Sequence, residues 1–314
     1  MSIMEKQPLI AIARAWIQLS RIPFHSVGVM PFLLGTVLAW KMDGVFSLPL
    51  FLLGVTAVIL IMLSTYYTGE YCDIVEDKLS ASLGRNAFSG GSQVVVKGLL
   101  PYEHAKIASY AALGLTVATG LVIQLRYNTG ALTIPLGVVG IVSGLFYSKM
   151  PIRWVAKGVG EVLIGLCYGW LPVAVAYYLQ TGTIATIIHF ISLPIACTIF
   201  NVILINEFPD HPADVIAKKS NLLVRLGKAR GALLYIAMTV AGWVTFLLSV
   251  LQGLPGVALV YYAPVFAVSF ILVIMMGRKS YLNRKMLQVM CGLTIATNLG
   301  TSLAYIVTIW TKGL

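Results

Sequence analysis

The feature that most constrains this chain is a succession of nine long apolar segments. A helix needs roughly 20 mainly apolar residues to cross the hydrocarbon core of a membrane. The segments that approach this length are 24–41, 46–68, 104–124, 129–147, 158–179, 184–206, 230–252, 254–276 and 286–310. A segment at that depth has no water to satisfy its backbone, so it must hydrogen-bond internally as a helix. The sequence therefore predicts an all-α fold, a polytopic membrane bundle of nine transmembrane helices.

Composition also favours lipid over water as the surroundings. Hydrophobic residues make up 59% of the 314 residues and charged residues only 11%, whereas a soluble domain carries about 25% charged residues. These proportions exclude a disordered chain, a disulfide scaffold and an ordinary cytosolic enzyme. We expect a single domain over residues 1–314. Its first part, residues 1–23, is expected to lie along the membrane interface.

The basic residues divide the loops into two sets and so predict the orientation. The formal net charge is +11, yet only Lys41, Arg126 and Lys312 lie on one of the two sides. Because basic loops stay in the cytoplasm, the N-terminus and the long loops are expected there. The charge excess thus follows from topology and predicts no nucleic-acid partner. We expect a multi-pass protein of the cytoplasmic membrane.

Seven of the eleven acidic residues fall in two short windows on the same side of the membrane. The first window holds Glu70, Asp73, Glu76 and Asp77, and the second holds Glu207, Asp210 and Asp214. Each window contains two aspartates four positions apart, which share a face wherever the helix continues. Carboxylates this close to a membrane are costly and indicate function. So many like charges require cations between them, and oxygen ligands suit Mg²⁺.

Basic residues in the same loops indicate an anionic substrate. Those considered as substrate ligands are Arg85, Lys149, Arg153, Lys157 and Lys218. Acidic clusters surrounded by Lys and Arg fit a diphosphate, because Mg²⁺ bridges carboxylate to phosphate and the cations hold the remaining oxygens. For any one of these residues, topology determination or contact with lipid headgroups is the alternative. The run 89–92 either cradles phosphate oxygens or forms a plain glycine turn.

The acidic windows resemble those of the UbiA superfamily of intramembrane prenyltransferases. That family carries Asn-Asp-x-x-Asp-x-x-x-Asp after its second helix and Asp-x-x-x-Asp after its sixth. The corresponding residues here are Gly69-Glu70-x-x-Asp73-x-x-x-Asp77 and Asp210-x-x-x-Asp214. The run from Tyr147 to Glu161 resembles the family's loop after helix four. The run from Phe88 to Val94 is most similar to the 1,4-dihydroxy-2-naphthoate branch. Gly69 and Glu70 depart from the family pattern.

The resemblance implies Mg²⁺-dependent transfer of a prenyl group from a polyprenyl diphosphate to a small aromatic acceptor. It further implies a central cavity that faces the cytoplasm and two Mg²⁺ ions. The implied metal ligands are Asp73, Asp77, Asp210 and Asp214, with Glu70 and Asn206 as additions. The implied diphosphate ligands are Arg153, Lys157, Lys218, Lys149, Arg85 and Ser148. The four aspartates and Tyr147 are the implied catalytic residues, with Tyr147 facing the allylic cation.

Three other functions share part of this pattern. An intramembrane terpene cyclase would use the same metals and diphosphate without a separate acceptor, and a related transferase would use a non-aromatic acceptor. A cation transporter would more typically place its acids near the bilayer midplane on broken helices. Both windows here lie towards one face beside dense basic charge, which favours an anionic substrate.

Overall fold

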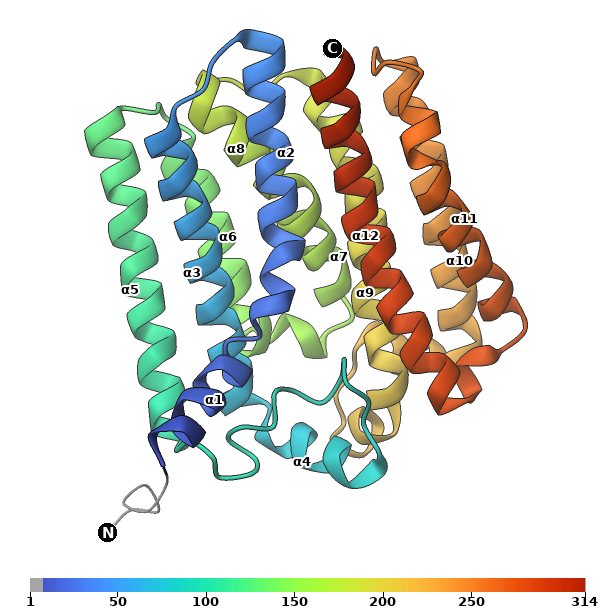
Figure 1. Cartoon of the computed structure of the whole chain (residues 1–314). Helices are drawn as coiled ribbons and strands as arrows, with labels where there is room; N and C mark the ends of the chain where they lie inside the picture. The colour runs from blue at the N-terminus through green and yellow to red at the C-terminus, as the bar shows by residue number, and fades with distance from the viewer. Residues whose placement is uncertain (1–7, 314) are drawn as a thin grey trace.

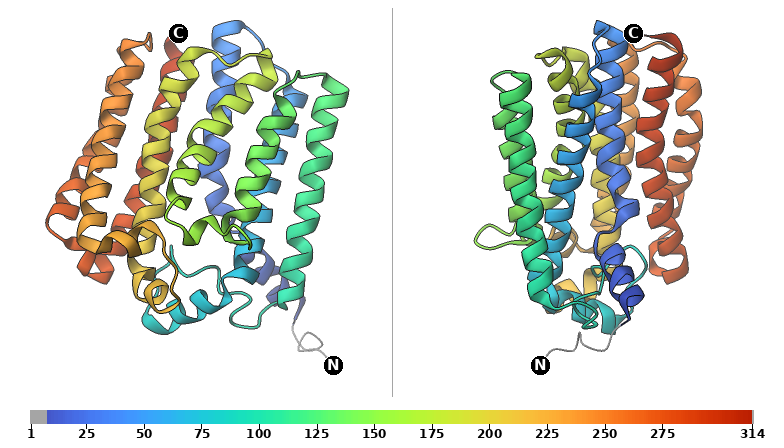
Figure 2. Two further views of the ribbon diagram at one scale, coloured as in Figure 1. Left: turned by 180° about the vertical axis from the view of Figure 1, so that it is seen from behind. Right: turned by 60° about the vertical axis from the view of Figure 1, so that its left-hand side comes forward.

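The structure is a computed structural model that describes residues 8–313, and every regular element in that range is helical. The long helices run side by side between the two ends of one bundle (Figures 1 and 2). The twelve α-helices are α1 (Leu9–Leu19), α2 (Ser26–Asp43), α3 (Leu48–Cys72), α4 (Ile74–Leu83), α5 (Tyr102–Tyr127), α6 (Thr133–Ser148), α7 (Gly160–Gly165), α8 (Leu171–Thr181), α9 (Thr186–Ile216), α10 (Leu222–Leu251), α11 (Ala258–Gly277) and α12 (Arg284–Lys312).

The all-helical prediction is confirmed for the described residues, whereas the count of nine spans is not. Eight helical segments in residues 8–313 are long and apolar enough to cross a membrane. The remaining expected span, 129–147, is represented by α6, which has only 16 residues. Such a helix rises about 24 Å, which is shorter than the hydrocarbon core.

Helix α1 lies across one end of the bundle instead of continuing into α2 (Figure 1). Arg21 adopts a left-handed conformation with φ 47°, and this breaks the helix before α2 begins. Leu9 and Ile10 are exposed on α1, whereas Ala15 and Leu19 are buried. This division is typical of a helix in the membrane interface. The interfacial position of the segment 1–23 stays a prediction. Residues 1–7 of that segment lie outside the described residues.

The expected span 158–179 is a single path with an irregular middle. Helix α7 passes through a π-helical turn, Leu166–Trp170, directly into α8. Pro172 at the start of α8 has no N–H to donate to the preceding turn, which favours such an irregularity. Gly169 permits close packing here, because a Cβ at this position would lie 2.5 Å from the Cα of Ala196 on α9.

The two segments that carry the acidic windows differ from the simplest expectation. Helix α3 ends at Cys72 and α4 begins at Ile74, so the helix is interrupted at Asp73. Helix α9, by contrast, continues past the expected end at residue 206 as far as Ile216. The segment between α4 and α5 then folds back beneath the bundle, at the same end as α1 (Figure 1).

Candidate active site

The two acidic windows meet at one end of the bundle, which we call the acidic end. Helix α4, which follows Asp73, packs against the final turns of α9. The hydroxyl of Ser80 on α4 donates to Oδ1 of Asp210 at 2.5 Å. The backbone N–H of Gly90 donates to the other oxygen of Asp210 at 2.9 Å. The sequence expectation that both windows lie on the same side therefore agrees with the structure.

Asp73 is held by the last residue of α6 and by an arginine of the loop that follows it. Ser148 donates its hydroxyl to Oδ2 of Asp73 at 2.6 Å. The guanidinium of Arg153 donates to Oδ1 of Asp73 at 2.8 Å and also to Glu76. Burial opposes the charge on Arg153, but these two carboxylates outweigh it and raise the pKa of the guanidinium above its usual value. Two of the expected diphosphate ligands thus contact a carboxylate of the first window.

Asp77 is buried in the first turn of α4, where a negative charge is favoured by the helix dipole. Gly91 lies so close that a Cβ there would be 2.0 Å from Oδ2 of Asp77. Burial, together with the charge of Glu70, raises the pKa of Asp77 to about 8, and Arg21 offsets only part of this shift. Arg21 from the N-terminal segment therefore belongs to the electrostatic environment of the site.

Asp214 is held by residues that immediately follow α9. Asn221 donates its side-chain amide to Oδ2 of Asp214 at 2.7 Å, and the ammonium of Lys219 lies 3.5 Å from Oδ1. Burial would lower the pKa of Lys219, but the charges of Asp214 and Asp73 raise it above the usual value. The ammonium of Lys219 is therefore influenced by the carboxylates of both windows.

The other two expected metal ligands, Glu70 and Asn206, differ in their surroundings. Glu70 is buried, and it accepts from the backbone N–H of Ser92 and lies 3.4 Å from Arg21. The side-chain oxygen of Asn206 is buried and has no hydrogen-bond partner in the described part of the chain. Such an oxygen is costly unless a ligand or water completes it.

Four of the expected basic ligands do not contact the acidic windows. Lys149 donates to the hydroxyl of Tyr110 on α5 at 2.5 Å. Arg85 donates to the backbone carbonyl of the next residue, Asn86. Lys157 and Lys218 are exposed at the acidic end. The structure therefore brings Arg153 and Ser148 to the carboxylates but not these four.

The donor chemistry at the acidic end fits Mg²⁺, although the ligands are not assembled in advance. Among residues 8–313, no three His, Cys, Asp or Glu side chains already converge as a metal site. Instead, Asp73, Asp210 and Asp214 each accept hydrogen bonds from protein donors. The available groups are carboxylate and amide oxygens, which are the ligands that a hard divalent ion prefers.

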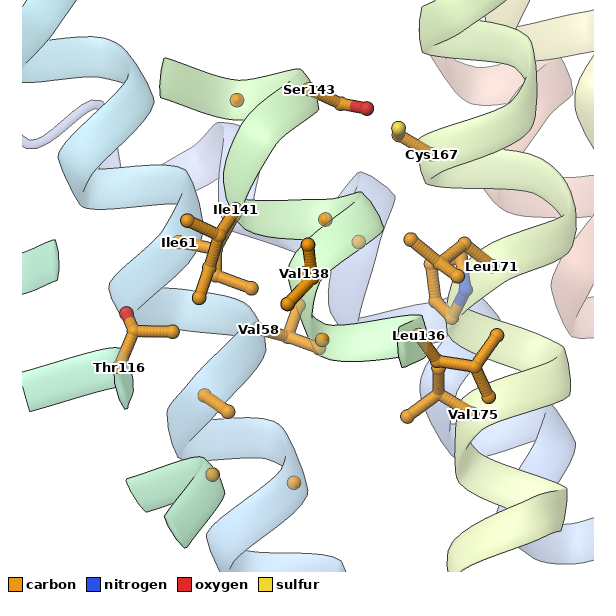
Figure 3. Close-up of a pocket in the computed structure, with 18 of the residues that line it drawn as sticks. Val58, Ile61, Thr116, Leu136, Val138, Ile141, Ser143, Cys167, Leu171 and Val175 are labelled. Atoms are coloured by element: carbon orange, nitrogen blue, oxygen red, sulfur yellow. The ribbon is translucent and has the colours of Figure 1, made fainter. Parts of the chain in front are cut away.

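An apolar cavity of about 270 Å³ lies inside the bundle. Its walls come from α3, α5, α6 and the α7–α8 path, and Figure 3 shows side chains of α3, α6 and α8 converging on it. Tyr147 lines the cavity near the acidic end, and Tyr178 lines it near the opposite end. Because Ser148 contacts Asp73, two consecutive residues connect the cavity to the first acidic window.

Residues 28–292 match the model of the UbiA prenyltransferase family. The chain belongs to this family. It is accordingly a prenyltransferase, as the resemblance of its motifs implies.

Two curated relatives are named 1,4-dihydroxy-2-naphthoate octaprenyltransferase. The protein from Bacillus subtilis is 28% identical over 71% of this chain and 69% of its own length. The protein from Mycobacterium leprae is 26% identical over 78% of this chain and 81% of its own length.

Solved structures of UbiA homologues have the same fold. The apo structure of a homologue from Aeropyrum pernix superposes with a TM-score of 0.66 at 17% identity, covering 90% of this chain and 97% of the other. A homologue from Archaeoglobus fulgidus bound to GPP and Mg²⁺ has a TM-score of 0.60 at 14% identity, covering 93% and 99%. These likenesses establish the UbiA fold for this prenyltransferase.

Sequence reasoning missed several residues of this UbiA site. The expected ligands include Lys218 but not Lys219, yet Lys218 follows α9 in a left-handed conformation with φ 56° and is exposed. Nothing in the spacing of two adjacent lysines distinguishes them. Arg21 carries no signal in the sequence, because only the fold brings the N-terminal segment to Glu70.

Proposed function

We propose that this protein transfers a prenyl group from a polyprenyl diphosphate to an aromatic acceptor, in a reaction that depends on two Mg²⁺ ions. The observation that carries the proposal is the junction at Tyr147 and Ser148. The first of these residues lines the apolar cavity and the second contacts Asp73. A prenyl diphosphate needs this combination, an apolar chamber for its chain and a charged site for its head.

In this proposal the four aspartates of the two windows hold the metal ions, with Asn206 as a further oxygen ligand. Bound Mg²⁺ neutralises the charge that develops on the departing diphosphate. Arg153 and Lys219 bind the oxygens that the metals leave free, and Lys157 and Lys218 add positive charge at the rim. Positive groups fixed in advance stabilise the developing negative charge and so lower the barrier to ionisation.

The reaction breaks the bond between the allylic carbon and a diphosphate oxygen, and both electrons leave with the diphosphate. A ring carbon of the acceptor then bonds to the allylic carbon and loses its proton. Tyr147 faces the cation with its aromatic ring, and the apolar wall of the cavity excludes water that would capture it. A 1,4-dihydroxy-2-naphthoate-like acceptor is favoured, in keeping with the names of the relatives.

The orientation forms part of the proposal. Basic residues concentrate at the acidic end, so this end is assigned to the cytoplasm of a cell-membrane protein. Water-soluble acceptors and diphosphate would then enter and leave on that side.

The test is to incubate the purified protein in lipid nanodiscs with labelled geranylgeranyl and longer diphosphates. Dihydroxynaphthoate, 4-hydroxybenzoate and homogentisate are offered in turn, with Mg²⁺ or with chelator. We expect a prenylated aromatic product only with Mg²⁺ and acceptor. A hydrocarbon product formed without acceptor would instead indicate a terpene cyclase. Product formation in excess chelator would exclude the metal mechanism.

A further inference from the structure

A short glycine-containing segment lies between the two acidic windows. We call residues 89–93 the strap. Gly90 donates its N–H to Asp210 at 2.9 Å, and the amide of Gln93 donates to the backbone carbonyl of Asp77 at 3.0 Å. Gly91 leaves no room for a side chain beside Asp77. The strap therefore contacts one aspartate from each window, and its position determines the space available between them.

The strap is anchored on its other side by Glu70. The carboxylate of Glu70 accepts from the backbone N–H of Ser92, and Gln18 of α1 donates to the carbonyl of the same residue at 2.7 Å. Both backbone polar groups of Ser92 are thus held, one by α3 and one by α1. Such paired contacts fix a loop more tightly than either contact alone.

Charge makes the contact with Glu70 the stronger of these two. The Glu70 side chain is buried, with 1% of its area exposed, and Arg21 lies 3.4 Å from it as a partly exposed counter-ion. A hydrogen bond to an ionised acceptor is about twice as strong as a neutral one. The strap amide and Arg21 share one carboxylate oxygen, whereas the second oxygen has no partner among residues 8–313.

The length of the Glu70 side chain matters to this contact. In the family motif the corresponding residue is Asp, which is one methylene shorter. An aspartate on the same backbone would fall short of the Ser92 amide by about one carbon–carbon bond. The departure of this chain from the family pattern therefore coincides with the contact that holds its strap.

We propose that Glu70 is a positioning residue that presets Asp77 and Asp210 through the strap, and is not a metal ligand. The inference rests on the proposed function for its kinetic consequence. Its structural part, that Glu70 fixes the strap, stands independently. A positioning residue and a metal ligand would respond in opposite ways to the substitutions Glu70→Asp and Glu70→Gln.

The first experiment measures hydrogen–deuterium exchange in the strap without metal or substrate. In Glu70→Asp the contact with Ser92 is lost, so the backbone amides of residues 86–97 should exchange about tenfold faster than in the wild type. Glu70→Gln keeps an acceptor in place and should exchange only slightly faster. Glu103→Gln, at an exposed position on α5, is the matched control for loss of a carboxylate. Unchanged strap exchange in Glu70→Asp would overturn the proposal.

The second experiment measures steady-state kinetics against Mg²⁺ and prenyl diphosphate. Glu70→Asp should raise the Mg²⁺ half-saturation and the KM by about tenfold, as for loss of an outer support of a metal site. Its kcat at saturation should stay within about threefold, because the metal ligands themselves are intact. Glu70→Gln should be milder in both parameters.

A metal ligand would give the reverse order. Asp would then preserve activity, whereas Gln would lower kcat severely even at saturating Mg²⁺, and that result would overturn the proposal. If Glu70→Asp does not fold, Gln18→Leu loosens the strap from its other side and should reproduce the faster exchange. Absence of any prenyl transfer by the wild type would refute the proposed function while leaving the exchange result to decide the role of Glu70.

Discussion

The two aspartate pairs have the same spacing but are built in different ways. Asp210 and Asp214 lie one turn apart on uninterrupted α9, so helix geometry alone brings them to one face. Asp73 lies at a helix break and Asp77 lies in the first turn of α4. Their placement depends on Arg153, which comes from a distant segment, and on the strap, which also contacts Asp210 of the second pair. A repeated sequence spacing therefore corresponds here to two different kinds of support.

The largest expected effect is common to both pairs and tests whether they form one site. Asp73→Asn and Asp210→Asn should each lower kcat for Mg²⁺-dependent diphosphate release by at least about 100-fold, the loss expected when charge stabilisation of a transition state is removed. The measurement uses protein whose helical circular dichroism is unchanged, with Glu103→Gln as the control. If only one of the two variants were impaired, the pairs would not act together.

The second prediction concerns the dependence of the first pair on close backbone approach. Gly91→Ala should raise the Mg²⁺ half-saturation by about 30-fold, because supporting residues of metal sites contribute at this level. The added Cβ would collide with Asp77, and the position has a left-handed φ of 65°. Gly69→Ala is the matched control, since its nearest atom would be the Ser148 hydroxyl at an ordinary 3.7 Å. Equal effects of the two substitutions would contradict the dependence of the first pair on the close approach of Gly91.

The third prediction compares the two adjacent lysines beside the second pair. Lys219→Gln should raise the KM for prenyl diphosphate by about tenfold, because this is the effect expected from loss of one charged hydrogen bond. Lys218→Gln should change it by less than about threefold, because an exposed charge is screened by water. The ammonium of Lys219 lies near Asp214, whereas Lys218 faces outward. A larger effect at Lys218 would restore the expectation from sequence.

Much of the fold and the location of the site follow from local patterns in the sequence. Apolar length predicts helices because only helices satisfy a backbone in lipid. The even number of spans between the acidic windows predicts that Asp73 and Asp210 lie at the same end, as observed. Helix α6 is the exception among the spans, since an apolar run of adequate length became a helix of 16 residues.

The remaining features depend on contacts between distant segments and could not be predicted. The break at Asp73 has no proline or glycine beside it to mark it. The strap reaches Asp210 from 120 positions away, and Arg21 reaches Glu70 from 49 positions away. Such placements depend on tertiary packing, which overrides local propensity.

The smallest expected effect is the pH dependence that Asp77 contributes to the stability of the protein. The pKa of Asp77 is raised to about 8, so the folded protein retains this proton at pH values where the unfolded chain has lost it. The resulting stabilisation is complete below about pH 4 and is lost as pH rises through about 8. In metal-free protein the unfolding temperature should therefore fall between pH 6 and pH 9.

The unfolding temperature of Asp77→Asn should fall less over that range, because its side chain cannot titrate. Added Mg²⁺ should likewise flatten the wild-type profile, because a bound divalent ion replaces the proton. Parallel profiles for the wild type and Asp77→Asn would show that Asp77 does not retain its proton in the folded protein.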